Sequence, residues 1–144
     1  MKIADVLQHK SRVVHSVLPW LTVGEVVDQL NRFGIGAVLV RDENGGVRGI
    51  VSERDIVRAL GQHSTGLLSK PLTEIMTQHV ETTTPQESVA RAMARMTAGR
   101  YRHLPVVENG EIVGLVSIGD LVKNRVREME MEVGILRDRA IAHL

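Results

Sequence analysis

The chain has 144 residues, 43% of them hydrophobic, with 18 lysine and arginine residues against 17 aspartate and glutamate residues. Basic and acidic residues are nearly equal in number, so the chain lacks the excess of basic residues expected of a nucleic-acid-binding protein. The chain has no cysteine, which excludes disulfides, thiolate catalysis and cysteine-ligated zinc. The six histidines show neither HxxxH nor HxH spacing, so no metal site is predicted.

Residues 1–8 reach an acidic residue before any apolar stretch of signal-peptide length. No segment approaches the roughly 20 apolar residues that a membrane span requires. These observations predict a cytoplasmic protein without a membrane partner.

The first predicted helix follows Pro19, and its apolar residues have the i, i+3, i+4, i+7 spacing of one helix face. The apolar run 37–40 then predicts a strand, and the Asn-Gly pair at 44–45 predicts a tight turn into a second strand. Another helix is expected after that strand. The apolar face of the first helix is formed by Val23, Val26, Val27 and Leu30.

The same order of elements returns in the second half of the chain. Residues 49–57, GIVSERDIV, match residues 114–122, GLVSIGDLV, and the run 37–40 matches 103–106. A second Asn-Gly pair, at 109–110, predicts the tight turn of the second copy. A unit that cannot bury its apolar face alone is usually built to bury it against a copy. The sequence therefore predicts two copies of one helix–strand–turn–strand–helix unit. The second copy of the helix face follows Pro85 and is formed by Val89, Ala92, Met93 and Met96.

Each copy carries Ser-x-x-Asp where a strand is expected to run into a helix. One interpretation is a capping box, in which the serine caps the helix and the acid reaches back without any ligand. The other is a ligand site, because helix N-termini attract phosphate, a carboxylate suits vicinal ribose hydroxyls, and the preceding glycine allows a close approach. The candidate residues are Ser52, Arg54 and Asp55 in the first copy and Ser117, Ile118, Gly119 and Asp120 in the second.

Basic residues gather near the second motif. Arg102 and His103 come just before its first strand, and Lys123 lies three residues beyond Asp120. An arginine fork and a titratable imidazole suit phosphate oxygens, although a solvated basic loop explains the same residues. The first copy has Gly36 and Ala37 at the matching positions, so two sites are not expected to bind equally.

After the second copy, apolar residues are spaced 4, 3, 4, 3, 4 along a strongly charged segment. That spacing predicts a long helix with a heptad seam. The helix either folds back on its own module or pairs with a second subunit. The seam is formed by Val122, Val126, Met129, Val133, Leu136 and Ala140.

Residues 1 to about 125 resemble a tandem pair of CBS domains, or Bateman module, and are similar to small stand-alone bacterial proteins of this kind. The matching motifs are IGAVLV at 35–40 followed by GIVSERD at 49–55, and RHLPVV at 102–107 followed by GLVSIGD at 114–120. The resemblance implies an α/β (α+β) fold in which each repeat is a three-stranded sheet with helices and the two repeats pack sheet to sheet. The expected division is repeat 1 at 1–69, repeat 2 at 70–125 and a C-terminal helix at 126–144.

The resemblance also implies a non-catalytic regulatory module that binds adenosine-containing ligands, such as AMP, ADP, ATP, NAD(H) or S-adenosylmethionine, in clefts between the repeats. AMP and NADH are the expected ligands, and a homodimer with an unidentified protein target is expected. Asp55 and Asp120 would take the ribose hydroxyls, Ser52 and Ser117 would lie near the phosphate, and Arg102 and His103 would reach phosphate oxygens. No catalytic constellation is found, and the chain is too short for a TIM barrel, which needs roughly 200 residues. The alternative is a ligand-independent dimerisation or partner-docking module.

Overall fold

A computed structural model describes residues 1–10, 13–63 and 65–142. The chain forms two compact units, one of residues 13–80 and one of residues 1–12 together with 81–144. Each unit contains one copy of the repeat, and both combine β-strands with α-helices in an α/β fold. The division differs from that expected along the sequence, because residues 1–12 belong with the second copy.

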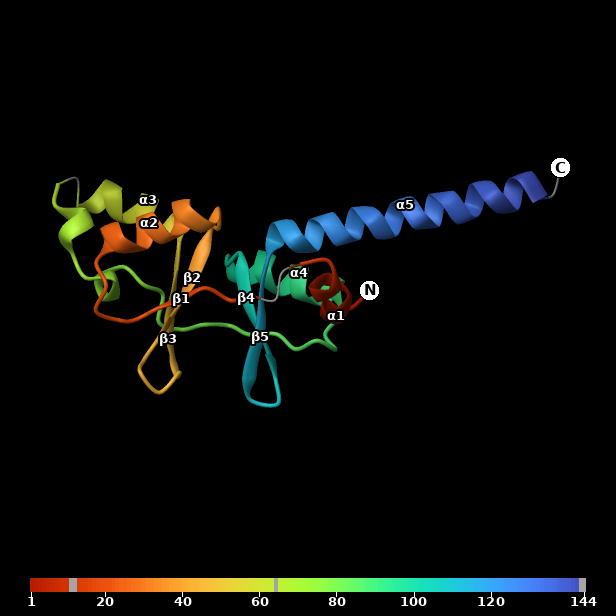
Figure 1. The fold of residues 1–144 in the computed structure, drawn as a ribbon. Coiled ribbons are helices and arrows are strands. Elements are labelled where there is room, and N and C mark those ends of the chain that lie inside the picture. The colour runs from red at the N-terminus through yellow and green to blue at the C-terminus, as the bar shows by residue number, and fades with distance from the viewer. Residues whose placement is uncertain (11–12, 64, 143–144) are drawn as a thin grey trace. The chain divides into compact units, whose positions relative to one another are not determined.

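The unit of residues 13–80 is built on a three-stranded sheet in the order β1-β2-β3 (Figure 1). β1 pairs parallel with β2, and β2 pairs antiparallel with β3. The sheet, α2 and α3 share one apolar core, which includes Val26, Val38 and Val51. The elements in chain order are β1 (Ser16–Val17), α2 (Val23–Phe33), β2 (Ala37–Arg41), β3 (Val47–Ser52), α3 (Glu53–Gln62), and the 3-10 turns η1 (Leu67–Ser69) and η2 (Leu72–Glu74).

The predicted helix face of α2 is confirmed, because Val23, Val26 and Leu30 are buried. Thr22 caps the helix by accepting from the backbone N–H of Glu25 at 3.2 Å, and the Glu25 carboxylate accepts from the Thr22 N–H at 3.2 Å in return. This reciprocal arrangement satisfies two N–H groups that have no partner within the helix. Gly34 ends the helix in the left-handed conformation at φ 61°.

The second unit has the same plan with a shorter sheet. β4 and β5 form an antiparallel pair, and Thr83 bridges Val106 in parallel at the place where β1 stands in the first unit. The expected three-stranded sheet is thus complete in the first unit, whereas here the third strand is reduced to a single bridge. The elements are α1 (Ile3–Gln8), α4 (Val89–Gly99), β4 (His103–Glu108), β5 (Glu111–Ser117) and α5 (Ile118–Ala142).

The N-terminal helix α1 completes the core of the second unit. Ile3, Val6 and Leu7 are buried among Met96, Leu104 and the other core residues of α4, β4 and β5. The backbone N–H of Ile3 donates to the backbone carbonyl of Glu87 at 2.9 Å, and the N–H of Val89 donates to the carbonyl of Met1 at 2.9 Å. These contacts explain why residues 1–12 join the second copy of the repeat.

The Asn-Gly turn of the second unit joins β4 to β5 as the sequence predicts. Asn109 and Gly110 both have positive φ, 54° and 77°. Two consecutive residues with positive φ give a turn whose twist matches that of the flanking strands. From this turn β4 and β5 pair as far as His103 and Ser117, where the candidate residues lie, with a shift of register between Val106 and Val107.

The long C-terminal helix is confirmed and begins directly at the second motif. α5 runs from Ile118 to Ala142, and its early residues Leu121 and Asn124 are buried. No helix within the described residues combines the length and the apolar character that crossing a bilayer demands.

Candidate functional site

The two Ser-x-x-Asp motifs occupy the same place in their units, at the junction of a strand and the following helix. Ser52 ends β3 and is the N-cap of α3. Ser117 ends β5, and α5 begins at the next residue. The strand holds the backbone before the serine in place. The first backbone N–H groups of the following helix have no acceptor within the helix, so this junction can bind a hydrogen-bond acceptor.

Both motifs form capping boxes. The Asp55 carboxylate accepts from the backbone N–H of Ser52 at 2.8 Å, and the Ser52 hydroxyl accepts from the N–H of Asp55 at 3.3 Å. In the second unit, the Asp120 carboxylate accepts from the N–H of Ser117 at 2.8 Å and the Ser117 hydroxyl accepts from the N–H of Asp120 at 3.1 Å. Both serines therefore cap their helices, and the serine and aspartate of each motif are held in fixed positions at the helix start.

The glycine before each motif makes room for another part of the chain. A Cβ atom on Gly49 would lie 2.7 Å from the carbonyl oxygen of Thr77, and one on Gly114 would lie 2.6 Å from a methyl carbon of Leu7. The sequence predicts a close approach by a ligand or by neighbouring backbone at these glycines. In both units the space is taken by the protein itself, so these glycines are explained by packing.

The environment of Asp120 is more strongly charged than that of Asp55. Lys10 places its ammonium nitrogen 2.5 Å from Asp120 Oδ2 in a partly buried ion pair, whereas Asp55 accepts from the neutral hydroxyl of Thr77 at 3.2 Å. Burial raises the pKa of the Asp120 carboxyl, but the hydrogen bonds from Lys10 and from the Ser117 backbone lower it more, so its pKa lies below the ordinary value of 3.8. Asp120 is therefore held as a carboxylate.

Lys10 was not among the site residues predicted from the sequence. It lies 110 residues from Asp120 along the chain, and no local pattern links a lysine after a short N-terminal helix to a motif at the start of α5. Only the packing of α1 against the second unit brings the ammonium to the carboxylate. The equivalent contact in the first unit comes from Thr77, in the segment that follows η2.

The structure brings Arg102 and His103 to the second motif. His103 is the cross-strand partner of Ser117, and the carbonyl of Arg102 accepts from the backbone N–H of Ile118 at 2.8 Å. The Arg102 side chain is exposed, as are Gly119 and Lys123 in the first turns of α5. The basic residues and the Ser117–Asp120 motif therefore meet at one end of the β4–β5 pair.

The first unit repeats this backbone arrangement without the basic side chains. Ala37 is the cross-strand partner of Ser52, and the carbonyl of Gly36 accepts from the N–H of Glu53 at 2.9 Å. Arg54 is exposed in the first turn of α3. The two candidate sites lie in separate compact units. They have the same backbone arrangement but differ in the charge of the side chains around it.

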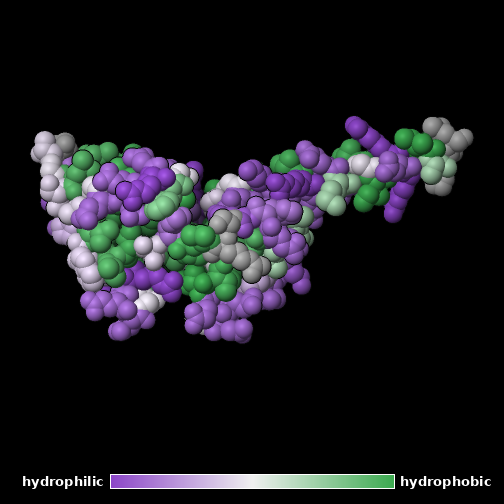
Figure 2. All heavy atoms as spheres, viewed as in Figure 1, coloured by the Kyte–Doolittle hydropathy of each residue, from purple (hydrophilic) through white to green (hydrophobic). Residues whose placement is uncertain are grey.

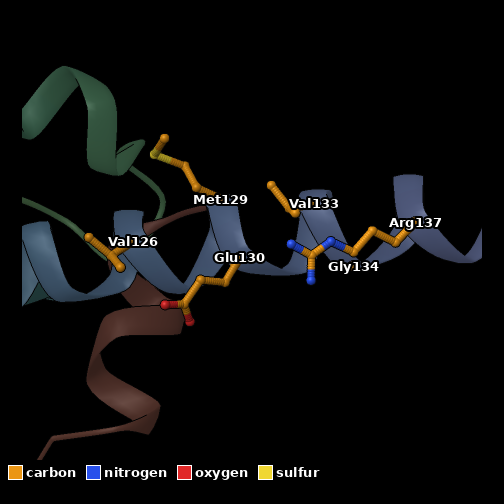
Figure 3. A pocket seen from close by; sticks show the side chains of 6 residues that line it. All are labelled: Val126, Met129, Glu130, Val133, Gly134 and Arg137. Carbon is orange, nitrogen blue, oxygen red and sulfur yellow. The ribbon is translucent and has the colours of Figure 1, made fainter.

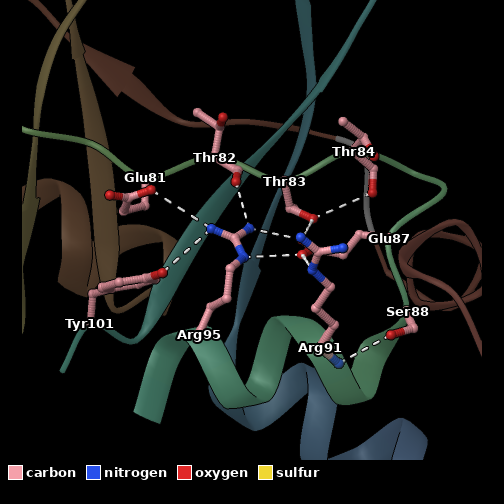
Figure 4. A network of polar contacts seen from close by, with 9 residues as sticks. All are labelled: Glu81, Thr82, Thr83, Thr84, Glu87, Ser88, Arg91, Arg95 and Tyr101. Atoms are coloured by element: carbon pink, nitrogen blue, oxygen red, sulfur yellow. Dashed lines mark hydrogen bonds and ion pairs between the residues drawn. The ribbon is translucent and has the colours of Figure 1, made fainter. Parts of the chain in front are cut away.

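A polar network at the start of α4 distinguishes the second unit further (Figure 4). The Glu87 carboxylate accepts from Arg95 at 3.0 and 2.7 Å and from the Thr83 hydroxyl at 2.5 Å. Arg95 also donates to the carbonyl of Thr82 at 2.7 Å. These contacts hold the segment before α4 against the helix, and no sequence pattern predicted them.

No group of three or more His, Cys, Asp and Glu side chains arranged to hold a metal ion occurs in the described part of the chain. Each unit instead presents one candidate site with a carboxylate at a helix start, and the basic groups are concentrated at the site of the second unit. Such an arrangement can accept hydrogen bonds from hydroxyls and attract an anion.

Comparison with known proteins identifies the two repeats. The model of the CBS domain family matches residues 4–62 and 72–127. A CBS-domain containing protein from Agrobacterium tumefaciens has a similar crystal structure, with a TM-score of 0.84 and 39% sequence identity, and the match covers 87% of this chain and 99% of the other.

Two similar structures contain adenosine compounds. The CBS domain protein PAE2072 from Pyrobaculum aerophilum is complexed with AMP; it has a TM-score of 0.76 and 29% identity over 92% of this chain and 99% of its own. The CBS domain pair of protein MJ0100 is in complex with 5′-methylthioadenosine and S-adenosyl-L-methionine, with a TM-score of 0.74 and 27% identity over 85% of this chain and 98% of its own. Because the family model matches most of the sequence, and does so twice, this chain belongs to the CBS domain family and is a tandem CBS domain pair.

Proposed function

We propose that this chain is a non-catalytic regulatory module that binds an adenosine-containing nucleotide, with AMP and NADH as the first candidates. The observation that carries the proposal is the carboxylate of Asp120, fixed at the start of α5 in an ion pair with Lys10, with His103 on the strand that pairs with Ser117 and Arg102 just before it. A carboxylate has about four lone-pair sites, so Asp120 can keep its capping bond and still accept from ribose hydroxyls. The AMP complex of a similar CBS domain protein supports this choice of ligand.

Each candidate residue of the second unit has a role in this proposal. Asp120 accepts from the ribose hydroxyls, while the Ser117 hydroxyl and the backbone N–H of Gly119 face the phosphate at the helix N-terminus. Arg102, His103 and Lys123 supply charge-assisted donors to phosphate oxygens. Ile118 provides backbone at the same helix start. In the first unit, Ser52 and Asp55 have the same roles, and Arg54 is the basic residue nearest to them in sequence.

Titration calorimetry and thermal unfolding of the full chain with AMP test the proposal. A ligand at 100 times its dissociation constant adds about 2.7 kcal/mol to the free energy of unfolding, so a clear rise in melting temperature is expected. ATP, NADH and S-adenosylmethionine are compared in parallel, and GMP serves as the control for the base. Absence of binding by all four adenosine compounds would contradict the proposal.

A ligand-independent docking module is the second candidate, and two observations favour it. The Ser-x-x-Asp motifs form complete capping boxes, and the preceding glycines are explained by Thr77 and Leu7. Both features of the motif thus have a structural role even without nucleotide. A null result in the calorimetric comparison would select this function.

The site of the second unit is expected to bind AMP more tightly than that of the first. Arg102→Ala and His103→Ala should each weaken the tighter site, since charge-assisted hydrogen bonds are roughly twice as strong as neutral ones. Its affinity should fall with added salt, and it should also fall as pH rises through the titration range of histidine, because phosphate favours the imidazolium form. Calorimetry at several pH values and salt concentrations measures both effects.

Arg48→Ala, which removes an exposed arginine from β3 of the other unit, is the matched control and should leave the tighter site unchanged. Two equal sites in the parent protein would contradict the expected inequality. So would Arg102→Ala and His103→Ala variants that bind AMP as well as the parent does.

A further inference from the structure

Most of α5 presents an unpartnered apolar side. Past its first two turns, the apolar residues of the predicted seam remain about half exposed, with exposed fractions of 48% for Val126, 55% for Met129 and 48% for Val133. These three line a shallow groove together with Glu130, Gly134 and Arg137 (Figure 3). Hydrophobic residues alternate with hydrophilic ones on the visible surface of this helix (Figure 2). The helix does not fold back on its own unit, so its seam is available to another helix.

We propose that this side of α5 pairs with α5 of a second copy of the chain in a parallel, in-register, two-stranded coiled coil. In heptad terms, Val126, Val133 and Ala140 occupy a positions, and Val122, Met129 and Leu136 occupy d positions. Val126 and Val133 at a with Leu136 at d is the combination that favours two strands in parallel coiled coils. This inference concerns assembly and does not rest on nucleotide binding.

The charges beside the seam fit a second copy in parallel orientation. In a parallel pair, a g residue of one helix faces the e residue five positions later on the other. Arg125 at g then faces Glu130 of the second copy, and Glu132 at g faces Arg137. Each contact joins opposite charges and occurs twice by symmetry.

The antiparallel orientation gives the opposite result. There e residues face e residues and g residues face g residues, and the alignment that uses all six seam positions sets Glu130 against Glu130 and Glu132 against Glu132. It also sets Arg125 against Arg139 and Lys123 against Arg137. Every flanking contact is then repulsive. A shift by one heptad removes the repulsion but leaves only four of the six seam positions of each helix in contact.

One flanking residue already has a partner within the subunit. Arg125 donates to the Glu128 carboxylate at 2.9 Å. A guanidinium carries five N–H donors in a fixed fork, so the same side chain can donate to Glu128 and to a carboxylate on the second helix.

Site-specific cross-linking distinguishes the two orientations, and the chain has no cysteine of its own. In the parallel pair, Ala140→Cys places both thiols in one layer, within disulfide reach. In the antiparallel alignment that uses all six positions, they are separated by about 27 Å, at 1.5 Å per residue. The full-length Ala140→Cys protein is therefore expected to form a disulfide dimer under mild oxidation, whereas Asp138→Cys, on the outward side of the helix, should cross-link far more slowly. Equal rates for the two variants would overturn the proposal.

A mixture of two further variants gives the reverse test. Val126→Cys and Leu136→Cys chains, mixed before oxidation, meet each other only in the antiparallel alignment. In a parallel pair these two positions are about 15 Å apart, so only cross-links between identical chains are expected. A cross-link between the two different chains would show an antiparallel pair and overturn the proposal.

Charge reversal tests the flanking contacts. Glu130→Arg sets two arginines against each other at both symmetric contacts and should weaken the dimer roughly tenfold, as measured by sedimentation equilibrium. Arg125→Glu should do the same, and an equimolar mixture of the two variants should recover a heterodimer because the opposite charges are restored. Asp138→Arg makes the same kind of charge change away from the seam and should leave the dimer unchanged. A parent protein that is monomeric, or equal effects of Glu130→Arg and Asp138→Arg, would overturn the proposal.

Discussion

Replacement of Asp120 by alanine is expected to weaken AMP binding about 10- to 100-fold. A hydrogen bond to a charged acceptor contributes about 1.5–3 kcal/mol, and 1.4 kcal/mol corresponds to a factor of ten in affinity. The substitution also removes the acid of the α5 capping box and the partner of Lys10, and the lost capping-box contact should lower the free energy of unfolding by about 1 kcal/mol. Titration calorimetry with AMP measures the loss of affinity, and urea unfolding of the same samples measures the loss of stability, so the two effects are separated.

Two further variants identify the cause of any loss. Asp55→Ala removes the equivalent capping-box acid in the first unit, so it should cost similar stability while leaving the tighter AMP site intact. Lys10→Met removes the ammonium but retains the carboxylate. An Asp120→Ala protein with unchanged AMP affinity and a lowered melting temperature would show that the motif of the second unit serves only as a helix cap.

Replacement of Glu87 by alanine is expected to lower the free energy of unfolding by about 2–3 kcal/mol at neutral pH. The Glu87 carboxylate is only 12% exposed and receives two hydrogen bonds from Arg95 and one from Thr83. Its removal leaves the Arg95 guanidinium, which is 29% exposed, without its main acceptor. That partial exposure keeps the expected loss below the 3–5 kcal/mol typical of a broken, fully buried pair.

The contribution of Glu87 should depend on pH in a defined direction. Burial raises the pKa of the Glu87 carboxyl, but the hydrogen bonds from Arg95 and Thr83 lower it more, so its folded-state pKa lies below the ordinary 4.5. A carboxyl with a lowered folded-state pKa stabilises the protein fully above its unfolded-state pKa, and the contribution is lost as pH falls through the folded-state value. Urea unfolding of the parent between pH 7 and pH 3 should therefore show a loss of stability on the acid side that is smaller in Glu87→Gln.

The control for this titration is Glu43→Gln, which changes an exposed carboxylate in the turn between β2 and β3. It should leave the acid-side slope of the parent unchanged. If Glu87→Gln and the parent lost stability in parallel between pH 5 and pH 3, the carboxylate network would have no measurable part in acid unfolding.

Local sequence patterns determined much of the fold. The spacing of Val23, Val26 and Leu30 predicted a buried helix face, and Asn109-Gly110 predicted the hairpin between β4 and β5. Ser-x-x-Asp was open between a cap and a ligand site, and the capping boxes now found explain its spacing in both copies. These features were readable because helix periodicity, caps and tight turns depend on residues within about four positions of each other.

The tertiary structure decided the features that depend on residues far apart in the chain. The sequence alone did not show that α1 completes the core of the second copy, or that Lys10 pairs with Asp120 across 110 residues. It left open whether Gly49 accommodates a ligand or a neighbouring backbone, and the structure places the Thr77 carbonyl there. Such contacts form when separate elements pack on one core. Sequence periodicity depends only on residues that are close together in the chain, so it cannot predict them. The repeated motif was therefore determined by the sequence, whereas the different charge at its two copies was in part decided by the fold.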